Sequence, residues 1–206
     1  MTSILKADNI QDADGNNIIN ESGNTITIGA SGDTISIPSG ATLANSGTVT
    51  GITQGITMAD QWRITANLSS NGTNVVGTNW ERNDTNFDKI GTGMTESSGI
   101  FTFPSTGIYI IIFNGLLYAD NAVAYAGFHL QQTTDNSSYT DAIYGYGGNA
   151  SASGRYSGFY GNGIFDVTNT TTHKIRLRTT SPSTVTFQGS TSIQVTGITF
   201  IRIGNT

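Results

Sequence analysis

The stretch from Asn86 to Phe113, NFDKIGTGMTESSGIFTFPSTGIYIIIF, decides the fold. Turns are predicted at Gly91–Gly93, Ser97–Gly99 and Pro104–Gly107, because proline presets one turn dihedral and glycine adopts the unusual ones. The segments between these turns predict β-strands. The short strand around Phe101–Phe103 and the longer strand that follows it therefore form a hairpin.

The last of these strands is apolar on both faces. Alternate residues of a strand point to opposite faces of its sheet. One face carries Tyr109, Ile111 and Phe113, and the other carries Ile108, Ile110 and Ile112. A parallel central strand would be covered on both faces, but nothing nearby reads as the crossover helix that a parallel sheet needs. We therefore expect one face to meet the strand's own core and the other to meet another subunit.

The closing segment, Ser192–Ile203, predicts a second strand of this kind. Ile198 and Phe200 share one of its faces, and Ile201 and Ile203 share the other. The predicted subunit interface therefore consists of Ile108, Ile110, Ile112, Ile198 and Phe200.

A spaced motif in the deciding stretch resembles a known family. The run Gly99-x-Phe101-x-x-Pro104-x-x-Gly107-x-Tyr109-x-x-x-Phe113 resembles the signature of C1q/TNF-like jelly-roll domains. The strand Trp80–Arg82, the hairpin Gly163–Arg178 and the closing strand are similar to strands of that family. The resemblance covers roughly residues 60–206. It implies an all-β, C1q/TNF-like jelly-roll sandwich that assembles as a homotrimer.

The N-terminal part carries a second resemblance. The opening ILKADNIQDADGNNIINES, the DQWRIT segment and the abundance of Asn, Thr and Gly are similar to virion proteins of marine bacteriophages that end in such a domain. Animal C1q differs, because this sequence has no collagen-like Gly-X-Y repeat and no cysteine. The resemblance implies location in the virion, in a tail-fibre or head-fibre-like appendage.

Composition narrows the classes of function. Nine Lys and Arg residues against 14 Asp and Glu residues give a net charge of −5, so a basic stripe for nucleic acid is not expected. The N-terminus lacks the apolar stretch of a Sec signal peptide, and no run approaches the length of a membrane span. We expect no nucleic-acid partner and no membrane insertion.

Residues 1–59 predict an N-terminal arm, and residues 60–206 predict the head. The arm contains two nine-residue repeats, GNTITIGAS and GDTISIPSG, followed by a Gly/Thr-rich join. The repeats place Ile26, Ile28, Ile35 and Ile37 on one side of short β-strands. Two repeats are too few for a free-standing solenoid, so three chains could wind these strands into a narrow fibre. A flexible arm with incidental alternation is the alternative.

No pattern of catalytic residues stands out. The two histidines, His129 and His173, lie in or beside predicted strands, where a lone histidine is usually structural. The sequence lacks a Gly-x-Ser-x-Gly elbow, a His-Glu-x-x-His motif and a Walker loop. Asp135 and Asp141 are weak candidates for a calcium site. We therefore predict no catalytic residues, no metal site, no cofactor and no enzymatic activity.

The segment Tyr139–Tyr160, YTDAIYGYGGNASASGRYSGFY, predicts a binding surface. Tyrosine supplies rigid contact area, and Gly and Ser allow the backbone to adapt, as in antibody paratopes. Its glycines are expected to interrupt any long strand and so bring aromatic residues out near loops. The candidate binding residues are Tyr144, Tyr146, Arg155, Tyr156, Phe159 and Tyr160. Packing of these tyrosines between sheets is the alternative.

Together these features predict a structural and adhesive protein of a phage virion. The expected partners are two further copies of the chain, other virion proteins through residues 1–50, and a host surface glycan or protein. A decoration protein that clamps capsid or tail subunits is the main alternative. A depolymerase is disfavoured because the sequence lacks an acidic cleft signature, and a secreted lectin because it lacks a signal peptide.

Overall fold

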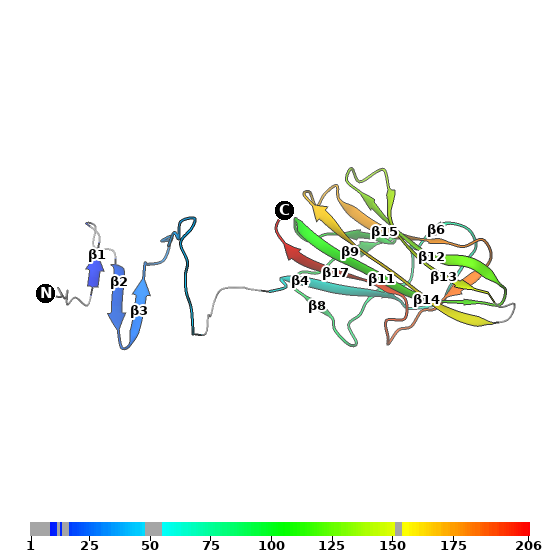
Figure 1. Ribbon diagram of the computed structural model, residues 1–206, viewed down its shortest axis with the longest axis horizontal. Helices are drawn as coiled ribbons and strands as arrows, with labels where there is room; N and C mark the ends of the chain where they lie inside the picture. Colours follow the sequence, from blue (N-terminus) through cyan, green and yellow to red (C-terminus); the bar gives the residue numbers. More distant parts are fainter. Residues whose placement is uncertain (1–8, 12, 14–16, 48–54, 151–153) are drawn as a thin grey trace. The chain divides into compact units, whose positions relative to one another are not determined.

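The computed structural model describes residues 9–11, 13, 17–47, 55–150 and 154–206. The chain divides into two compact units, Met1–Ile52 and Thr53–Thr206. In the described ranges every helix or strand assigned is a β-strand, as Figure 1 shows. Within these ranges no helix is long and apolar enough to cross a membrane. The all-β prediction is confirmed.

The N-terminal unit contains a small antiparallel sheet. Its strands, in the order β1-β2-β3, are β1 (Asn9–Gln11), β2 (Asn17–Ser22) and β3 (Thr25–Ile28). The turn between β2 and β3 has positive φ at both central residues, Gly23 (56°) and Asn24 (67°), which suits a tight two-residue hairpin. Of the predicted arm, residues 1–8, 12, 14–16 and 48–54 lie outside the described residues.

Only the first of the two predicted repeat strands forms. β3 covers the TITI of the first repeat, but the TISI of the second, residues 34–37, has no regular secondary structure. A strand requires a neighbour for its backbone hydrogen bonds, and within the described residues this segment pairs with none. The isoleucines of both repeats are exposed, with Ile26 67% and Ile35 62% accessible.

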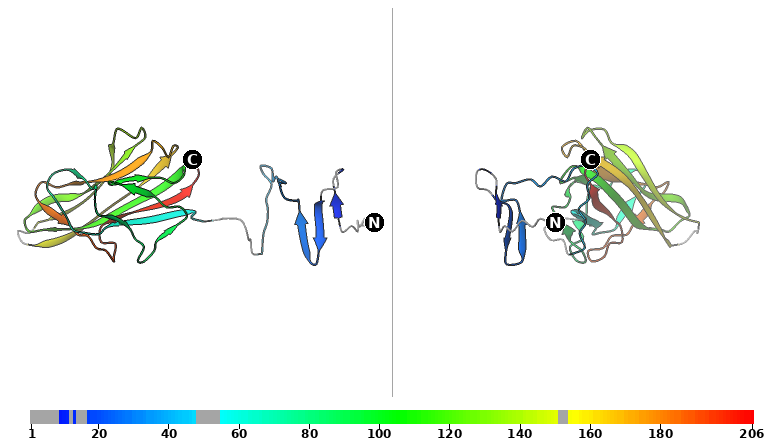
Figure 2. Two further views of the ribbon diagram at one scale, coloured as in Figure 1. Left: turned by 180° about the vertical axis from the view of Figure 1, so that it is seen from behind. Right: turned by 60° about the vertical axis from the view of Figure 1, so that its left-hand side comes forward.

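The second unit, the head, is a sandwich of two antiparallel sheets (Figures 1 and 2). The β11 sheet contains β4 (Met58–Ile64), β5 (Leu68–Ser70), β7 (Trp80–Arg82), β8 (Lys89–Ile90), β11 (Gly107–Ala119), β14 (Arg155–Val167), β16 (Val185–Phe187) and β17 (Gly197–Gly204). The β12 sheet contains β6 (Asn74–Val75), β9 (Thr95–Ser97), β10 (Ile100–Thr102), β12 (Val123–Thr133), β13 (Thr140–Asn149) and β15 (Lys174–Thr180). β4 begins two residues before the predicted start of the head.

The chain passes repeatedly from one sheet to the other. It crosses from β11 to β12, returns from β13 to β14, and crosses again from β14 to β15. In the β11 sheet, β11 lies between β14 and β17, and β17 lies beside β4. In the β12 sheet, β12 lies between β13 and β15. This alternation is the jelly-roll arrangement that the family resemblance implies. The two predicted hairpins are wrong, because β10 and β11, and likewise β14 and β15, belong to different sheets and do not pair.

The inward face of β11 anchors the core between the sheets. Tyr109, Ile111 and Phe113 are at most 1% exposed, whereas Ile112 on the other face is 38% exposed. The Tyr109 hydroxyl donates to the carbonyl of Ser105 (2.9 Å), which ties the strand to the turn before it. The strand therefore has one face in its own core and one apolar face directed outward.

Two of the predicted interface residues belong to this core instead. Ile198 and Phe200 of β17 are both 0% exposed. The residue pairs Ile111–Phe200 and Phe113–Ile198 are opposite each other in the β11–β17 ladder, so they share the inward face. Their assignment to a subunit interface is wrong, because the outward residues of β17 are their chain neighbours, such as Ile201.

Candidate binding surfaces

The six predicted binding residues do not form one surface. Tyr144 and Tyr146 lie on the outward face of the β12 sheet, whereas Tyr156 and Tyr160 lie on the outward face of the β11 sheet. The predicted segment crosses from one sheet to the other between β13 and β14, and its residues 151–153 lie outside the described residues.

The remaining two predicted residues have different positions again. Phe159 is 4% exposed and packs edge-to-face against Phe128, with ring centroids 5.0 Å apart. Its assignment as a binding residue is wrong, because alternate side chains of β14 point into the sandwich. Arg155 is exposed at the start of β14, on the opposite sheet from Tyr144.

The outward face of the β12 sheet carries a group of tyrosines. The rings of Tyr144 and Tyr146 are stacked, with centroids 5.9 Å apart and planes inclined by 13°. Tyr125 on β12 lies beside them, 5.5 Å from Tyr146. All three are between 44% and 58% exposed. We call this group, together with the polar residues described next, the tyrosine surface.

A hydrogen-bonded carboxylate lies at the centre of the tyrosine surface. Arg178 donates to Asp141 through Nε (2.9 Å) and through Nη2, which makes the pair bidentate. Gln131 donates through Nε2 to the same carboxylate (2.7 Å). Its side-chain oxygen Oε1 accepts a hydrogen bond from Nε of Arg176 (2.7 Å). These bonds join strands β12, β13 and β15 and hold the side chains in fixed positions.

His129 connects this network to the tyrosines. The imidazole is 7% exposed, with its centroid 4.3 Å from that of Tyr144. Its Nδ1 lies 2.9 Å from Asp141 Oδ2 and 2.7 Å from Arg178 Nη2, so it donates to the first or accepts from the second according to its tautomer. Its Nε2 lies 2.5 Å from the hydroxyl of Tyr146.

The ionisation of these groups favours binding over nucleophilic chemistry. The hydrogen bond from Arg178, together with those from His129 and Gln131, holds the pKa of Asp141 well below its usual range. Burial, with the neighbouring phenols of Tyr144 and Tyr125, raises the pKa of Tyr146 above that of an ordinary tyrosine. At neutral pH the carboxylate is therefore an acceptor and the phenol keeps its proton. The Asp–His–Tyr line can orient a ligand, but it does not supply a phenolate nucleophile.

The cations of β15 are residues that sequence reasoning missed. Lys174, Arg176 and Arg178 alternate with the buried Ile175 and Leu177. The Arg176 guanidinium lies over the ring of Tyr139, 3.8 Å from its centroid. The signal is present in the sequence as the alternation KIRLR, which places all three cations on one face of a strand.

The outward face of the β11 sheet has different chemistry. Ile164 is 70% exposed and lies opposite Ile110 in the β11–β14 ladder. Tyr160 is 73% exposed, and Tyr156 packs against Tyr118 with centroids 5.1 Å apart. The predicted interface residues Ile108, Ile110 and Ile112 all lie on this face. It is an apolar and aromatic surface.

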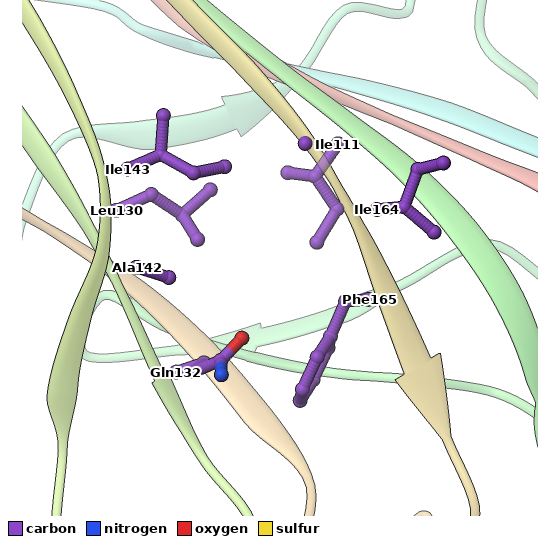
Figure 3. Close-up of a pocket in the computed structure, with 8 residues that line it drawn as sticks. Ile111, Leu130, Gln132, Ala142, Ile143, Ile164 and Phe165 are labelled. Atoms are coloured by element: carbon purple, nitrogen blue, oxygen red, sulfur yellow. The ribbon is translucent and has the colours of Figure 1, made fainter.

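A cavity of about 400 Å³ opens between the two sheets beside β13 and β14. Figure 3 shows Leu130, Gln132, Ala142 and Ile143 on one side of it and Ile111, Ile164 and Phe165 on the other. Its labelled lining is apolar except for the Gln132 amide. The cavity offers no set of convergent polar groups for a small ligand.

The other sequence candidates for chemistry are structural. His173 stacks on Phe165, with ring centroids 5.6 Å apart and planes inclined by 30°. Asp135 accepts bonds from the Thr133 hydroxyl and from the backbone N–H groups of Ser137 and Ser138, which lower its pKa. Across the described ranges, His, Asp and Glu side chains nowhere gather in threes to hold a metal ion.

Comparison with known proteins supports the fold assignment. No model of a protein family matches the sequence, and no curated protein does either. The structure is similar to murine APRIL at pH 5.0, with a TM-score of 0.51 and 14% identity over 71% of this chain and 98% of that one. It is also similar to Eiger TNF from S. frugiperda, with a TM-score of 0.54 and 8% identity over 72% of this chain and 93% of that one. The head is therefore a TNF-like jelly roll.

Proposed function

We propose that this chain is the subunit of a homotrimeric bacteriophage virion protein with a structural and adhesive role. The head contacts a surface glycan or protein of the host, and residues 1–50 attach it to other virion proteins. The apolar outward face of the β11 sheet carries the proposal of an oligomer. The resemblance of the N-terminal sequence to marine phage proteins supports its place in the virion.

The outward face of the β11 sheet is an exposed apolar surface that we expect a partner to cover. Isoleucine and tyrosine side chains on β11 and β14 are exposed over adjacent positions of the ladder. A contiguous apolar patch of this kind usually marks a protein contact. A second copy of the chain is the occupant that the TNF-like fold and the C1q/TNF-like motif favour, and closed rotational symmetry then sets a finite number of copies.

The role is non-catalytic. The tyrosine surface contains hydrogen-bond donors and acceptors and aromatic rings, but the Tyr146 hydroxyl, which meets the histidine, keeps its proton at neutral pH. The cavity between the sheets is lined mainly by apolar side chains. The tyrosine surface suits recognition, and neither feature supplies an activated nucleophile or a pair of free carboxylates.

The test measures what the purified full chain binds. Fluorescently labelled protein is incubated with host cells and, separately, with emptied capsids. Saturable binding to cells supports the adhesive role. Binding to capsids alone would assign the chain to the decoration proteins, and binding to neither would contradict both.

A further inference from the structure

We propose that the tyrosine surface is the site that binds an acidic oligosaccharide. Sugar rings lie against Tyr144 and Tyr146, and the carboxylate or sulfate of the sugar is bound by Arg176. The inference deepens the proposed function, because it rests on a head that meets a glycan-bearing surface. It places the contact on the β12 sheet, not on Arg155 and the tyrosines of β14.

The stacked tyrosines offer apolar area at fixed positions. The rings of Tyr144 and Tyr146 are nearly parallel, and Tyr125 extends the group on the neighbouring strand. Tyrosine loses little conformational entropy on binding, and here the packing of its ring against His129 reduces that loss further. Saccharide rings have apolar C–H faces, which can cover such a surface while their hydroxyl groups remain hydrated.

Arg176 supplies an available cation. Its Nε is bound to Gln131, but within the described part of the chain its Nη atoms carry no hydrogen bond. Stacking on Tyr139 holds the guanidinium in place. Its free edge matches the geometry of a carboxylate or sulfate, which accepts paired N–H groups.

Of the two acidic residues near the site, Asp141 has its charge offset by Arg178, whereas Asp135 keeps its negative charge. Asp141 is paired with Arg178, and Asp135 accepts three hydrogen bonds within its own turn. Lys174, which is 9% exposed, donates to the carbonyl of Thr170 and lies on the same face as Arg176. Three cations, Lys174, Arg176 and Arg178, against two carboxylates give this group one net positive charge on a chain whose net charge is −5, and this favours an anionic ligand.

The contrast between the two outward faces favours a hydrated ligand on the β12 sheet. The β11 sheet presents isoleucines, which need a permanent cover. On the tyrosine surface the aromatic rings surround a polar floor, His129 and Gln131, each 7% exposed. Such a surface is stable in water without a partner, and its fixed donors and acceptors fit a ligand rich in hydroxyl groups.

The test uses calorimetric titration of the full chain with three hexasaccharides. An alginate hexauronate carries carboxylates, a sulfated galactan hexasaccharide carries sulfates, and cellohexaose is neutral. We expect binding of at least one acidic probe, at least tenfold tighter than cellohexaose and weakened by added salt. The two acidic probes distinguish a carboxylate ligand from a sulfate ligand.

Four variants locate the site. Tyr144→Ala and Arg176→Gln should each weaken acidic binding at least tenfold, as expected for a central Tyr or Arg contact. Tyr144→Phe keeps the ring and should weaken binding less than Tyr144→Ala. Arg155→Ala, on the opposite sheet, should change affinity less than twofold. All four should keep the wild-type melting temperature within about 2 °C, because none of the three side chains is buried.

Failure of this inference and failure of the proposed function can be told apart. Binding of none of the three probes, or acidic binding that survives both Tyr144→Ala and Arg176→Gln, would overturn the glycan site. A drop confined to Arg155→Ala would move the site to β14. A third outcome combines two results: the wild type binds an acidic oligosaccharide and Tyr144→Ala does not, but the wild type does not adsorb to host cells. That outcome would support the glycan site and contradict the adhesive role.

Discussion

At the scale of single residues, close packing between the sheets explains the glycines of β13 and β14. A Cβ at Gly161 would overlap the ring of Phe113, and one at Gly145 would lie 2.7 Å from the same ring and 2.5 Å from the Tyr160 carbonyl. Phe113 is fully buried and cannot move aside. These glycines therefore make room for an aromatic core residue, and the strands continue through them.

Gly161→Ala should destabilise the head by about 1–3 kcal/mol, as expected for overpacking. Gly158→Ala on the same strand is the matched control, since the nearest atom to its added Cβ is 4.0 Å away. Urea unfolding at equal protomer concentration measures both. In a Phe113→Leu background, where the ring is absent, Gly161→Ala should cause a smaller loss in the free energy of unfolding. Equal stability of the two alanine variants would contradict the packing explanation.

Asp141 should contribute to stability in a pH-dependent way. Its folded-state pKa is depressed, mainly by Arg178, below the value of about 3.9 for an unfolded aspartate. The folded state therefore binds fewer protons, and the stabilisation is complete above about pH 5 and declines as the pH falls towards the folded-state pKa. In urea unfolding at pH 7, Asp141→Asn should be less stable than the wild type. When the pH is lowered from 5 to 3, the stability of Asp141→Asn should fall by less than the stability of the wild type. Parallel pH profiles would contradict this.

At the scale of elements, a buried carboxylate joins β4 to its neighbours. Asp60 is 0% exposed and accepts from Arg82 of β7 through Nε (2.9 Å). It also accepts from the backbone N–H of Met94 (2.6 Å) and from the indole of Trp62 (3.0 Å). One carboxylate therefore satisfies donors from three segments at the edge of the β11 sheet.

Removing this carboxylate should be costly. Asp60→Ala leaves two buried N–H donors without their acceptor and removes the carboxylate paired with Arg82, whose side chain is 25% exposed, so we expect a loss of about 2–4 kcal/mol in the free energy of unfolding. Asp84→Ala is the control, because Asp84 is 66% exposed and lies 3.4 Å from Arg63. That variant should stay within about 0.5 kcal/mol of the wild type. Similar losses of unfolding free energy in the two variants would show that the Asp60 carboxylate contributes no more to stability than an exposed one.

The elements predicted best from sequence are those with a strong local signal. Gly99 shows the unusual dihedral that its turn requires, with φ of 82°, and the alternation of Ile and aromatic residues in β11 marks both of its faces. Periodicity alone does not say which face is inward. The sequence pattern therefore predicts Ile198 and Phe200 at the subunit interface, and only the pairing of β17 with β11 places them in the core.

The candidate site was harder to predict because it is assembled across strands. Tyr144 and Tyr146 were identified from local composition. His129, Arg176 and Arg178 come from β12 and β15, so their contact with Asp141 depends on sheet order and register. The glycines of β13 and β14 also favoured a loop-rich segment, whereas they permit two long strands that pass close to each other.

At the scale of the whole molecule, the two units suggest separate tasks. The N-terminal sheet β1-β2-β3 is a body of its own, and the head contains the sandwich core. Deleting residues 1–50 should leave a folded head of wild-type melting temperature that no longer joins virions. Incorporation is measured by immunoblotting of purified particles. Retained incorporation of the truncated head would move the attachment surface onto the sandwich.

The oligomeric state is the most direct test of the outward face of the β11 sheet. Fully burying an isoleucine contributes about 1.5–3 kcal/mol, so several such residues per subunit would support a stable assembly. Light scattering at micromolar concentration should give three times the chain mass of 21.7 kDa. A folded, monodisperse wild-type monomer would contradict the trimer.

A single charge on that face should dissociate the assembly without unfolding the chain. Ile164 is 70% exposed within one subunit, so Ile164→Asp costs the isolated sandwich little, but in a trimer it would bury an unpaired carboxylate. We expect soluble monomers with the β-rich circular dichroism of the wild type. Thr140→Asp, at an exposed position of β13, is the control and should remain trimeric. If Ile164→Asp also stays trimeric, the interface includes neither Ile164 nor its neighbour across the ladder, Ile110.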